Sequence, residues 1–151
     1  MSAILGKYFE DFEVDMEFVT MGRTMTEADI VNFAGFTGDF NPLHTDAQYA
    51  SSSIFGERVA HGMCGFVMAT ALLVRLNIFE GTIVAFIGID NWRFYAPIKI
   101  GDTIHMKARV VEKRESKKGG QGQIILDEKV LNQEGTLVMG GIVRALMKMR
   151  P

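Results

Sequence analysis

A carboxylate and an imidazole lie five residues apart in residues 38–44 (GDFNPLH), where Asp39 and His44 stand on either side of Pro42. Proline fixes its own φ and restricts the residue before it, so this segment should form a tight, irregular turn. Across such a turn both side chains can converge on one small polar molecule. Because a carboxylate accepts hydrogen bonds and an imidazole donates or accepts them, the pair can hold and deprotonate a water molecule. This chemistry suits the addition of water to an activated double bond, or its removal.

The same residue types also have a purely structural interpretation. Asp, Asn and Pro are common turn formers, and a histidine beside them can serve only to cap the next helix. Spacing alone favours this turn-only interpretation. The catalytic one requires a cleft that excludes bulk water, a role for which the neighbouring Phe36 and Phe40 are candidates.

Helices are expected on both sides of the turn. Residues 26–29 (TEAD) resemble a capping box, and an apolar stripe continues to Gly38, where glycine allows the helix to end. A second, short helix should run from a cap at residues 45–46 to about Ser52. Residues 61–77 (HGMCGFVMATALLVRLN) are apolar on almost every face, so this third helix must be covered on most sides by other structure.

The remaining segments alternate or are rich in β-branched and aromatic residues, which predicts strands. One buried helix and a large antiparallel sheet predict an α+β fold in which the sheet curls around the helix. Such a sheet leaves an edge strand unpaired, and edge pairing between two copies would give a homodimer or a larger homo-oligomer. The expected strands are residues 13–20, 83–95, 103–114, 123–131 and 137–149, with turns at 97–102, 117–122 and 132–136.

Bulk properties restrict the possible partners. The 151 residues fit one domain spanning 1–151, and a net charge of −2 gives no reason to expect nucleic acid or an anionic membrane as a partner. The apolar stretch 63–74 is too short to cross a bilayer, and charges interrupt the first residues, so neither a membrane span nor a signal peptide is expected. The single cysteine, Cys64, cannot form an internal disulfide, which suits a cytoplasmic location.

Three segments resemble a known family. Residues 36–46 (FTGDFNPLHTD), with Ala50 further along, resemble the signature of the MaoC-like, (R)-specific enoyl-CoA hydratase family. Residues 58–63 (RVAHGM) resemble the start of its central helix, and residues 95–103 (YAPIKIGDT) resemble a turn between its later strands. The resemblance implies a hot-dog fold, in which an antiparallel five-stranded sheet wraps around a long central helix.

The resemblance also implies roles for individual residues. Asp39 and His44 would be the catalytic pair, and Asn41 would brace the turn. The backbone N–H of Gly62 would form the oxyanion hole, because a helix N-terminus presents free N–H donors where enolate charge develops. Thr70 would shape the site, although a mid-helix threonine commonly bonds its own helix backbone. No metal is implied, and no cofactor apart from the CoA of the substrate.

The implied activity is reversible hydration of trans-2-enoyl thioesters to (R)-3-hydroxyacyl thioesters carried on CoA or on acyl carrier protein. A hot-dog thioesterase is an alternative. The resemblance implies that such an enzyme uses a carboxylate on the central helix to attack the thioester or to activate water, and residues 61–77 contain neither Asp nor Glu. A noncatalytic acyl-thioester-binding subunit is a second alternative. The presence of both Asp39 and His44 argues against it, because a protein that only binds has no need for two such polar groups in an apolar cleft. His61 is expected to orient the turn before the helix, and Cys64 to pack in the core.

Overall fold

The protein folds as an antiparallel sheet curled around one helix, and the computed structural model describes it for residues 6–151. The strands follow the order β1-β4-β5-β6-β3, and a two-residue strand, β2, also pairs with β4. The α+β prediction is confirmed. The sheet has six strands in place of five, because two short N-terminal strands, β1 and β2, each pair with β4. The bounds are β1 Glu17–Val19, β2 Arg23–Thr24, β3 Ile83–Phe94, β4 Thr103–Glu115, β5 Gln121–Leu131 and β6 Leu137–Lys148.

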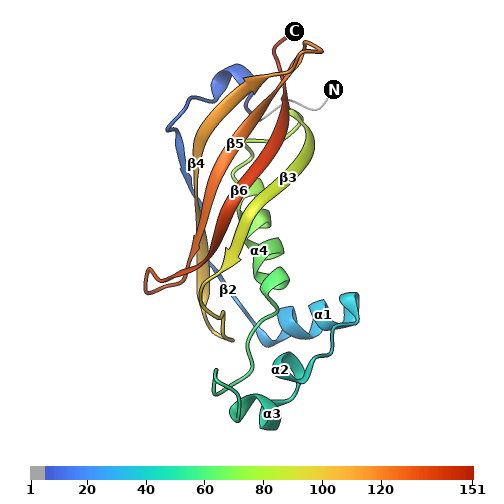
Figure 1. The fold of residues 1–151 in the computed structure, drawn as a ribbon, viewed down its shortest axis with the longest axis vertical. Helices are drawn as coiled ribbons and strands as arrows, with labels where there is room; N and C mark the ends of the chain where they lie inside the picture. The colour runs from blue at the N-terminus through green and yellow to red at the C-terminus, as the bar shows by residue number, and fades with distance from the viewer. Residues whose placement is uncertain (1–5) are drawn as a thin grey trace.

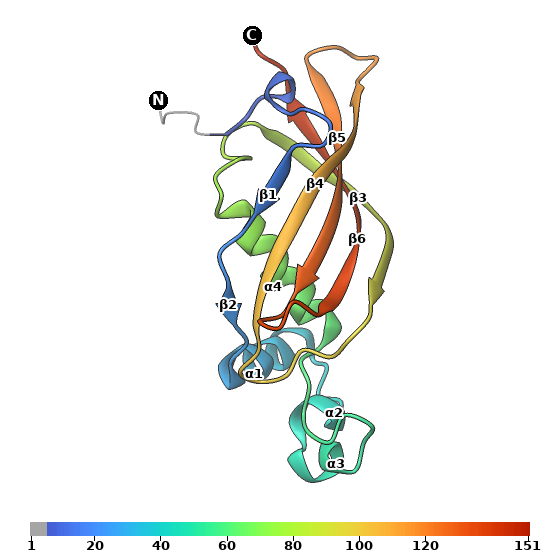
Figure 2. The same cartoon turned by 90° about the vertical axis from the view of Figure 1, so that its left-hand side faces the viewer.

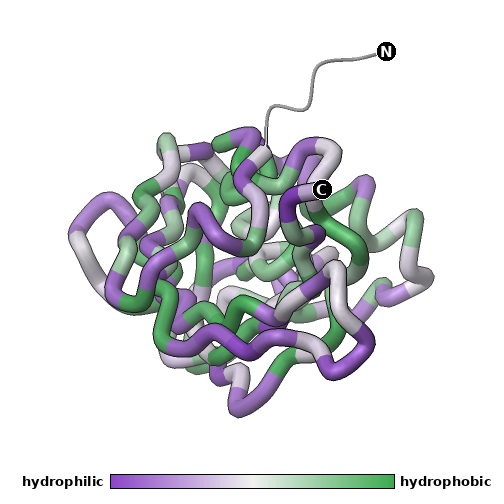
Figure 3. The backbone as a smooth tube through the Cα atoms, turned by 90° about the horizontal axis from the view of Figure 1, so that it is seen from above, coloured by the Kyte–Doolittle hydropathy of each residue, from purple (hydrophilic) through white to green (hydrophobic). Residues whose placement is uncertain are grey.

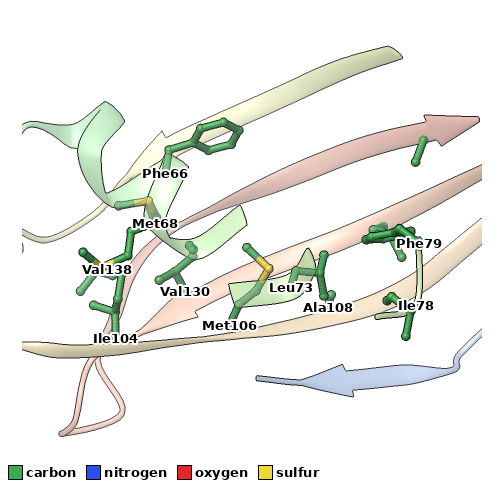
Figure 4. Packing of buried hydrophobic residues seen from close by; sticks show 14 of the residues in the cluster. Phe66, Met68, Leu73, Ile78, Phe79, Ile104, Met106, Ala108, Val130 and Val138 are labelled. Atoms are coloured by element: carbon green, nitrogen blue, oxygen red, sulfur yellow. The ribbon is translucent and has the colours of Figure 1, made fainter. Parts of the chain in front are cut away.

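Helix α4 (Gly62–Val74) lies along the concave side of the sheet, as Figures 1 and 2 show from two directions. Alternate residues of β4 face the helix and are almost inaccessible to solvent, which confirms the two-residue periodicity expected for this strand. Seen from above, hydrophilic and hydrophobic residues alternate along much of the backbone (Figure 3). Figure 4 shows the resulting core, in which Met68 and Leu73 of α4 lie on the side of Ile104, Met106, Ala108, Val130 and Val138 of the sheet, whereas Phe66 points towards β3, where it packs against Trp92.

Three shorter helices cluster near the N-terminal end of α4 (Figure 1). Helix α1 (Glu27–Thr37) has the predicted capping box, with Thr26 as N-cap, and it ends at Gly38 in the left-handed conformation (φ 76°). The expected irregular turn contains one further helical turn, α2 (Pro42–Thr45), because proline fits the first helical position, where an N–H has no partner. Helix α3 (Ala47–Ser51) follows directly, and a 3-10 turn, η1 (Phe9–Asp11), precedes the sheet.

Residues 6–151 cover α4 on most sides, as expected, and leave one side uncovered. Met63, Val67 and Val74 are about half exposed on that side. The edge strand β3 pairs only with β6 and also exposes apolar side chains. A sheet that curls past one face of a helix cannot reach the opposite face. Among residues 6–151, no helix has the length and apolarity needed to span a bilayer.

One carboxylic acid is buried in the core. Glu128 of β5 is only 2% exposed, and its register partners are the small residues Ala108 and Gly141. Burial raises the pKa of Glu128 to about 8, because desolvation disfavours the carboxylate, and the neighbouring charge of Asp127 raises it further. The folded protein therefore holds a proton on Glu128 at a pH where the unfolded chain releases it.

This shift predicts a pH-dependent stability. The folded-state pKa lies above the ordinary value of 4.5, so the contribution of Glu128 is fully present below pH 4.5 and is lost as pH rises towards about 8. Glu128→Gln should match the wild type in urea unfolding at pH 5 and exceed it at pH 9 by roughly a few kcal/mol. A difference between the two proteins that does not change with pH would contradict this assignment.

Candidate active site

The turn after α1 fixes the backbone of Asp39. Thr37 Oγ1 donates to the carbonyl of Phe33 (2.7 Å) and accepts a bond from the N–H of Asp39 (3.2 Å). A carboxylate oxygen of Asp39 in turn accepts a bond from the N–H of Asn41 (3.2 Å). Local bonds therefore hold Asp39 from both sides and orient its carboxylate across the turn.

Asn41 and His44 are fixed by α2. Asn41 is the N-cap of this helix, and its Oδ1 accepts a bond from the N–H of Leu43 (3.0 Å), so the structure places it where it braces the turn. His44 Nδ1 lies 2.7 Å from the carbonyl oxygen of Val59. Because a carbonyl can only accept, His44 donates through Nδ1, and in the neutral ring Nε2 keeps the lone pair needed to accept a proton.

Long-range contacts hold the segment that leads into α4. The guanidinium of Arg58 binds both carboxylate oxygens of Glu27 at the start of α1, with Nη1 2.8 Å from Oε1, and Arg58 lowers the pKa of this carboxyl. The N–H of Ala60 donates to the carbonyl of Ile98 (2.8 Å). The start of α4 is thereby fixed relative to α1 and to the turn after β3.

His61 is the site residue whose position could not be derived from the sequence. It is 3% exposed, and its Nε2 lies 2.9 Å from the backbone carbonyl oxygen of Asp39. Its ring stacks on that of His44, with centroids 3.8 Å apart, and its other neighbour is Phe33, at 5.0 Å. Asp39, His44 and His61 each have one oxygen or nitrogen atom that could bind a metal ion, and these three atoms lie within 4.8 Å of one another.

Two cavities meet at this cluster. The smaller, of about 260 Å³, is lined by Asp39 together with Phe33 and Thr37. The larger, of about 530 Å³, is mostly apolar and includes Phe55, Val59, Phe94 and Met139 among its lining residues. His44, His61, Gly62 and Met63 line both cavities. A molecule in the larger cavity can therefore reach the acid and imidazole groups at its end.

Gly62 lies where the two cavities join and is the first residue of α4. No side chain caps this helix, so the N–H groups of its first turn remain available at the cavity wall. A Cβ atom on Gly62 would lie 2.8 Å from the ring of Phe94, closer than such atoms approach. Glycine at this position lets the Phe94 ring pack closely against a helix N-terminus, where the dipole favours negative charge.

Other residues singled out from the sequence lie elsewhere. Thr70 donates to the carbonyl of Phe66 in its own helix (2.9 Å) and lines a hollow on the uncovered side of α4, so the structure does not bring it to the Asp39 and His44 cluster. Phe36 and Phe40 do not shield the site, since they are 90% and 61% exposed, and Phe33 is the aromatic residue that lies there. Cys64 is buried as expected, and burial raises the pKa of its thiol.

One carboxylate and two imidazoles are also a donor set that divalent transition metals bind. One nitrogen of each ring already bonds a backbone carbonyl oxygen, His44 Nδ1 that of Val59 and His61 Nε2 that of Asp39. This arrangement suits hydrogen bonding to a small polar molecule better than chelation of an ion.

The chain is similar in sequence to one protein family over most of its length. The profile of the MaoC like domain matches residues 11–130. Protein MaoC of Klebsiella aerogenes is 44% identical over 101 residues, which are 67% of this chain and 30% of that protein. An (R)-specific enoyl-CoA hydratase of Rhodospirillum rubrum is 37% identical over 99 residues, which are 64% of this chain and 65% of that protein. The chain thus aligns with less than two thirds of the length of either relative.

Solved structures resemble the whole chain. A monoamine oxidase regulatory protein from Archaeoglobus fulgidus superposes with a TM-score of 0.91 at 36% identity, covering 97% of both chains. A Mycobacterium tuberculosis protein with a double hot-dog fold superposes with a TM-score of 0.84 at 21% identity, covering 99% of this chain and 46% of that one. The second likeness concerns the fold alone, and it identifies the curled sheet and central helix as a hot-dog fold.

Proposed function

The chain belongs to the MaoC-like family, and we propose that it is a hydratase that interconverts trans-2-enoyl and (R)-3-hydroxyacyl thioesters. One observation carries this proposal. Asp39 lines the smaller of two adjoining cavities, and His44 and the uncapped N-terminus of α4 line both, so all three border the place where the cavities meet. A water molecule and a thioester can therefore be held side by side.

The proposed mechanism assigns a role to each of these groups. The acyl thioester occupies the larger cavity, with its carbonyl oxygen directed at the N–H of Gly62, where enolate charge develops. Asp39 and His44 hold a water molecule and remove one of its protons as the oxygen bonds to C3. The same pair returns a proton to C2, so the elements of water are added without a cofactor. The reverse sequence dehydrates the hydroxyacyl thioester.

The proposal is tested by incubating the purified protein with trans-2-enoyl-CoA substrates of increasing chain length. The panel includes branched and dicarboxylic members, and the loss of enoyl absorbance is followed. Turnover of at least one member, with the thioester intact, is the expected result. Release of free CoA without enoyl consumption would favour a thioesterase, and tight binding without turnover would favour a noncatalytic subunit.

We further propose that the protein works as a homodimer joined along β3 and the uncovered face of α4. The two elements adjoin, since Phe66 packs edge-on against Trp92 and Gly62 faces Phe94. A long edge strand with free backbone groups and apolar side chains is a template for pairing with another chain. The exposed apolar residues of this surface are Met63, Val67 and Val74 of α4 and Ile83, Val84, Phe86, Ile87, Ile89 and Phe94 of β3.

A charge on this surface should dissociate the dimer. Val67→Lys places an ammonium group at the centre of the proposed contact, where no partner is available to neutralise it. Sedimentation equilibrium should give twice the chain mass for the wild type and the chain mass for the variant. Val19→Lys, at a similarly exposed position on β1 at the opposite edge of the sheet, is the matched control and should remain dimeric. A monomeric wild type would refute the proposed interface.

A further inference from the structure

We propose that His61 is a positioning residue that holds Asp39 and His44 in register with each other, and this role rests on the hydratase function proposed above. The two reactive groups belong to different elements: Asp39 follows α1, and His44 lies in α2. His61, the N-cap residue of α4, contacts both of them. It is the link between the turn that carries the chemistry and the helix that carries the oxyanion donor.

The contact with Asp39 is a hydrogen bond to the backbone. Because a carbonyl oxygen only accepts, the ring of His61 donates through Nε2 over 2.9 Å. The Asp39 carboxylate itself is oriented through the N–H of Asn41. The His61 bond therefore sets where the main chain of Asp39 lies, and the local turn sets the direction of its side chain.

The contact with His44 is a ring stack. His44 is tethered at Nδ1 to the carbonyl of Val59, which leaves its ring free to tilt about that bond. The face of His61, 3.8 Å away between centroids, removes this freedom. His61 is held in turn by Phe33, and it is almost fully buried. Its Nδ1 is buried and has no hydrogen-bond partner among residues 6–151, so none of these residues directs the ring through that atom.

Two substitutions separate these contacts. His61→Phe keeps a ring against His44 but removes the donor to the Asp39 carbonyl. His61→Gln keeps an amide donor close to the position of Nε2 but removes the ring. Each variant should lower kcat by roughly tenfold to a hundredfold with little change in KM, because displacement of reacting groups by about 1 Å can cost a hundredfold in rate. Leu73→Ala, a cavity-forming change at the far end of α4, is the control for lost stability and should keep kcat.

Nuclear magnetic resonance of the imidazole nitrogens reports the tautomer of His44 directly, and this signal does not change when a variant is only less stable. The chain has only three histidines, so the signals of His44 can be assigned by substitution of the others. The wild type and His61→Phe should show His44 protonated at Nδ1, whereas His61→Gln should show a mixture of tautomers. An unchanged kcat in both variants, or an unchanged His44 signal in His61→Gln, would overturn the proposal. A wild type without hydratase activity would refute the proposed function instead, and the His44 signals would still test the positioning role.

Discussion

Replacing Asp39 with asparagine should lower kcat by roughly a hundredfold to ten-thousandfold, the usual contribution of a general acid–base group. Asparagine retains an oxygen that can accept the N–H of Asn41, so the turn should keep its shape. His44→Asn should have a similar effect on kcat, because its amide can still donate to the carbonyl of Val59 but cannot accept a proton. Both losses are expected with thermal unfolding close to that of the wild type.

The double variant distinguishes a working pair from two independent contributors. If Asp39 and His44 act on the same water molecule, the kcat of the double variant should be close to that of the less active single variant. The effects of substituting residues that act as a unit are strongly non-additive. His105→Gln is the histidine control, since His105 lies on β4 away from both cavities. Losses that simply multiply would mean that the two groups serve different steps.

Gly62→Val is the second change for which we expect a large effect. A side chain at this position collides with the ring of Phe94, so the ring or the start of α4 must shift where both line the larger cavity. Loss of one oxyanion donor typically costs about a hundredfold to a thousandfold in kcat, and we expect a loss of this size. Steady-state kinetics on the best substrate of the enoyl-CoA panel would measure it.

Two controls separate this effect from a change in helix stability. Gly35→Ala in α1 adds a methyl group that meets nothing within 4 Å, so it should leave the rate unchanged. Phe94→Ala combined with Gly62→Ala removes the colliding ring and should recover part of the activity lost in Gly62→Ala alone. If Gly62→Val turned over at the wild-type rate, the oxyanion role of this helix end would have to be abandoned.

Most of the fold follows from local patterns in the sequence. Alternation places Ile104, Met106 and Ala108 on one face of β4, and the capping box at Thr26 marks the start of α1. The same kind of alternation could have identified the buried acid, because Ile124, Leu126 and Glu128 follow one another at two-residue intervals on the inward face of β5. These features depend on residues close together in the chain.

Features that depend on distant contacts could not be obtained in this way. An apolar stretch shows that α4 must be covered but does not show whether the same chain or a second copy covers each face. Phe33 and Phe36 are both aromatic residues near the turn. Only the packing of Phe33 against His61 shows that Phe33, and not the exposed Phe36, lies at the site. The bond from His61 to Asp39 joins residues 22 positions apart, and no local pattern indicates it.

Hydration in water labelled with a heavy oxygen isotope tests the central claim most directly. With the best substrate of the enoyl-CoA panel, the account predicts that the label enters the hydroxyl group at C3, that the product is the (R) isomer, and that the thioester remains intact. It also predicts that Asp39→Asn suppresses this incorporation. Label found in a free carboxylate alongside released CoA, or hydroxyl labelling that persists undiminished in Asp39→Asn, would contradict the claim that Asp39 and His44 activate water for addition to the double bond.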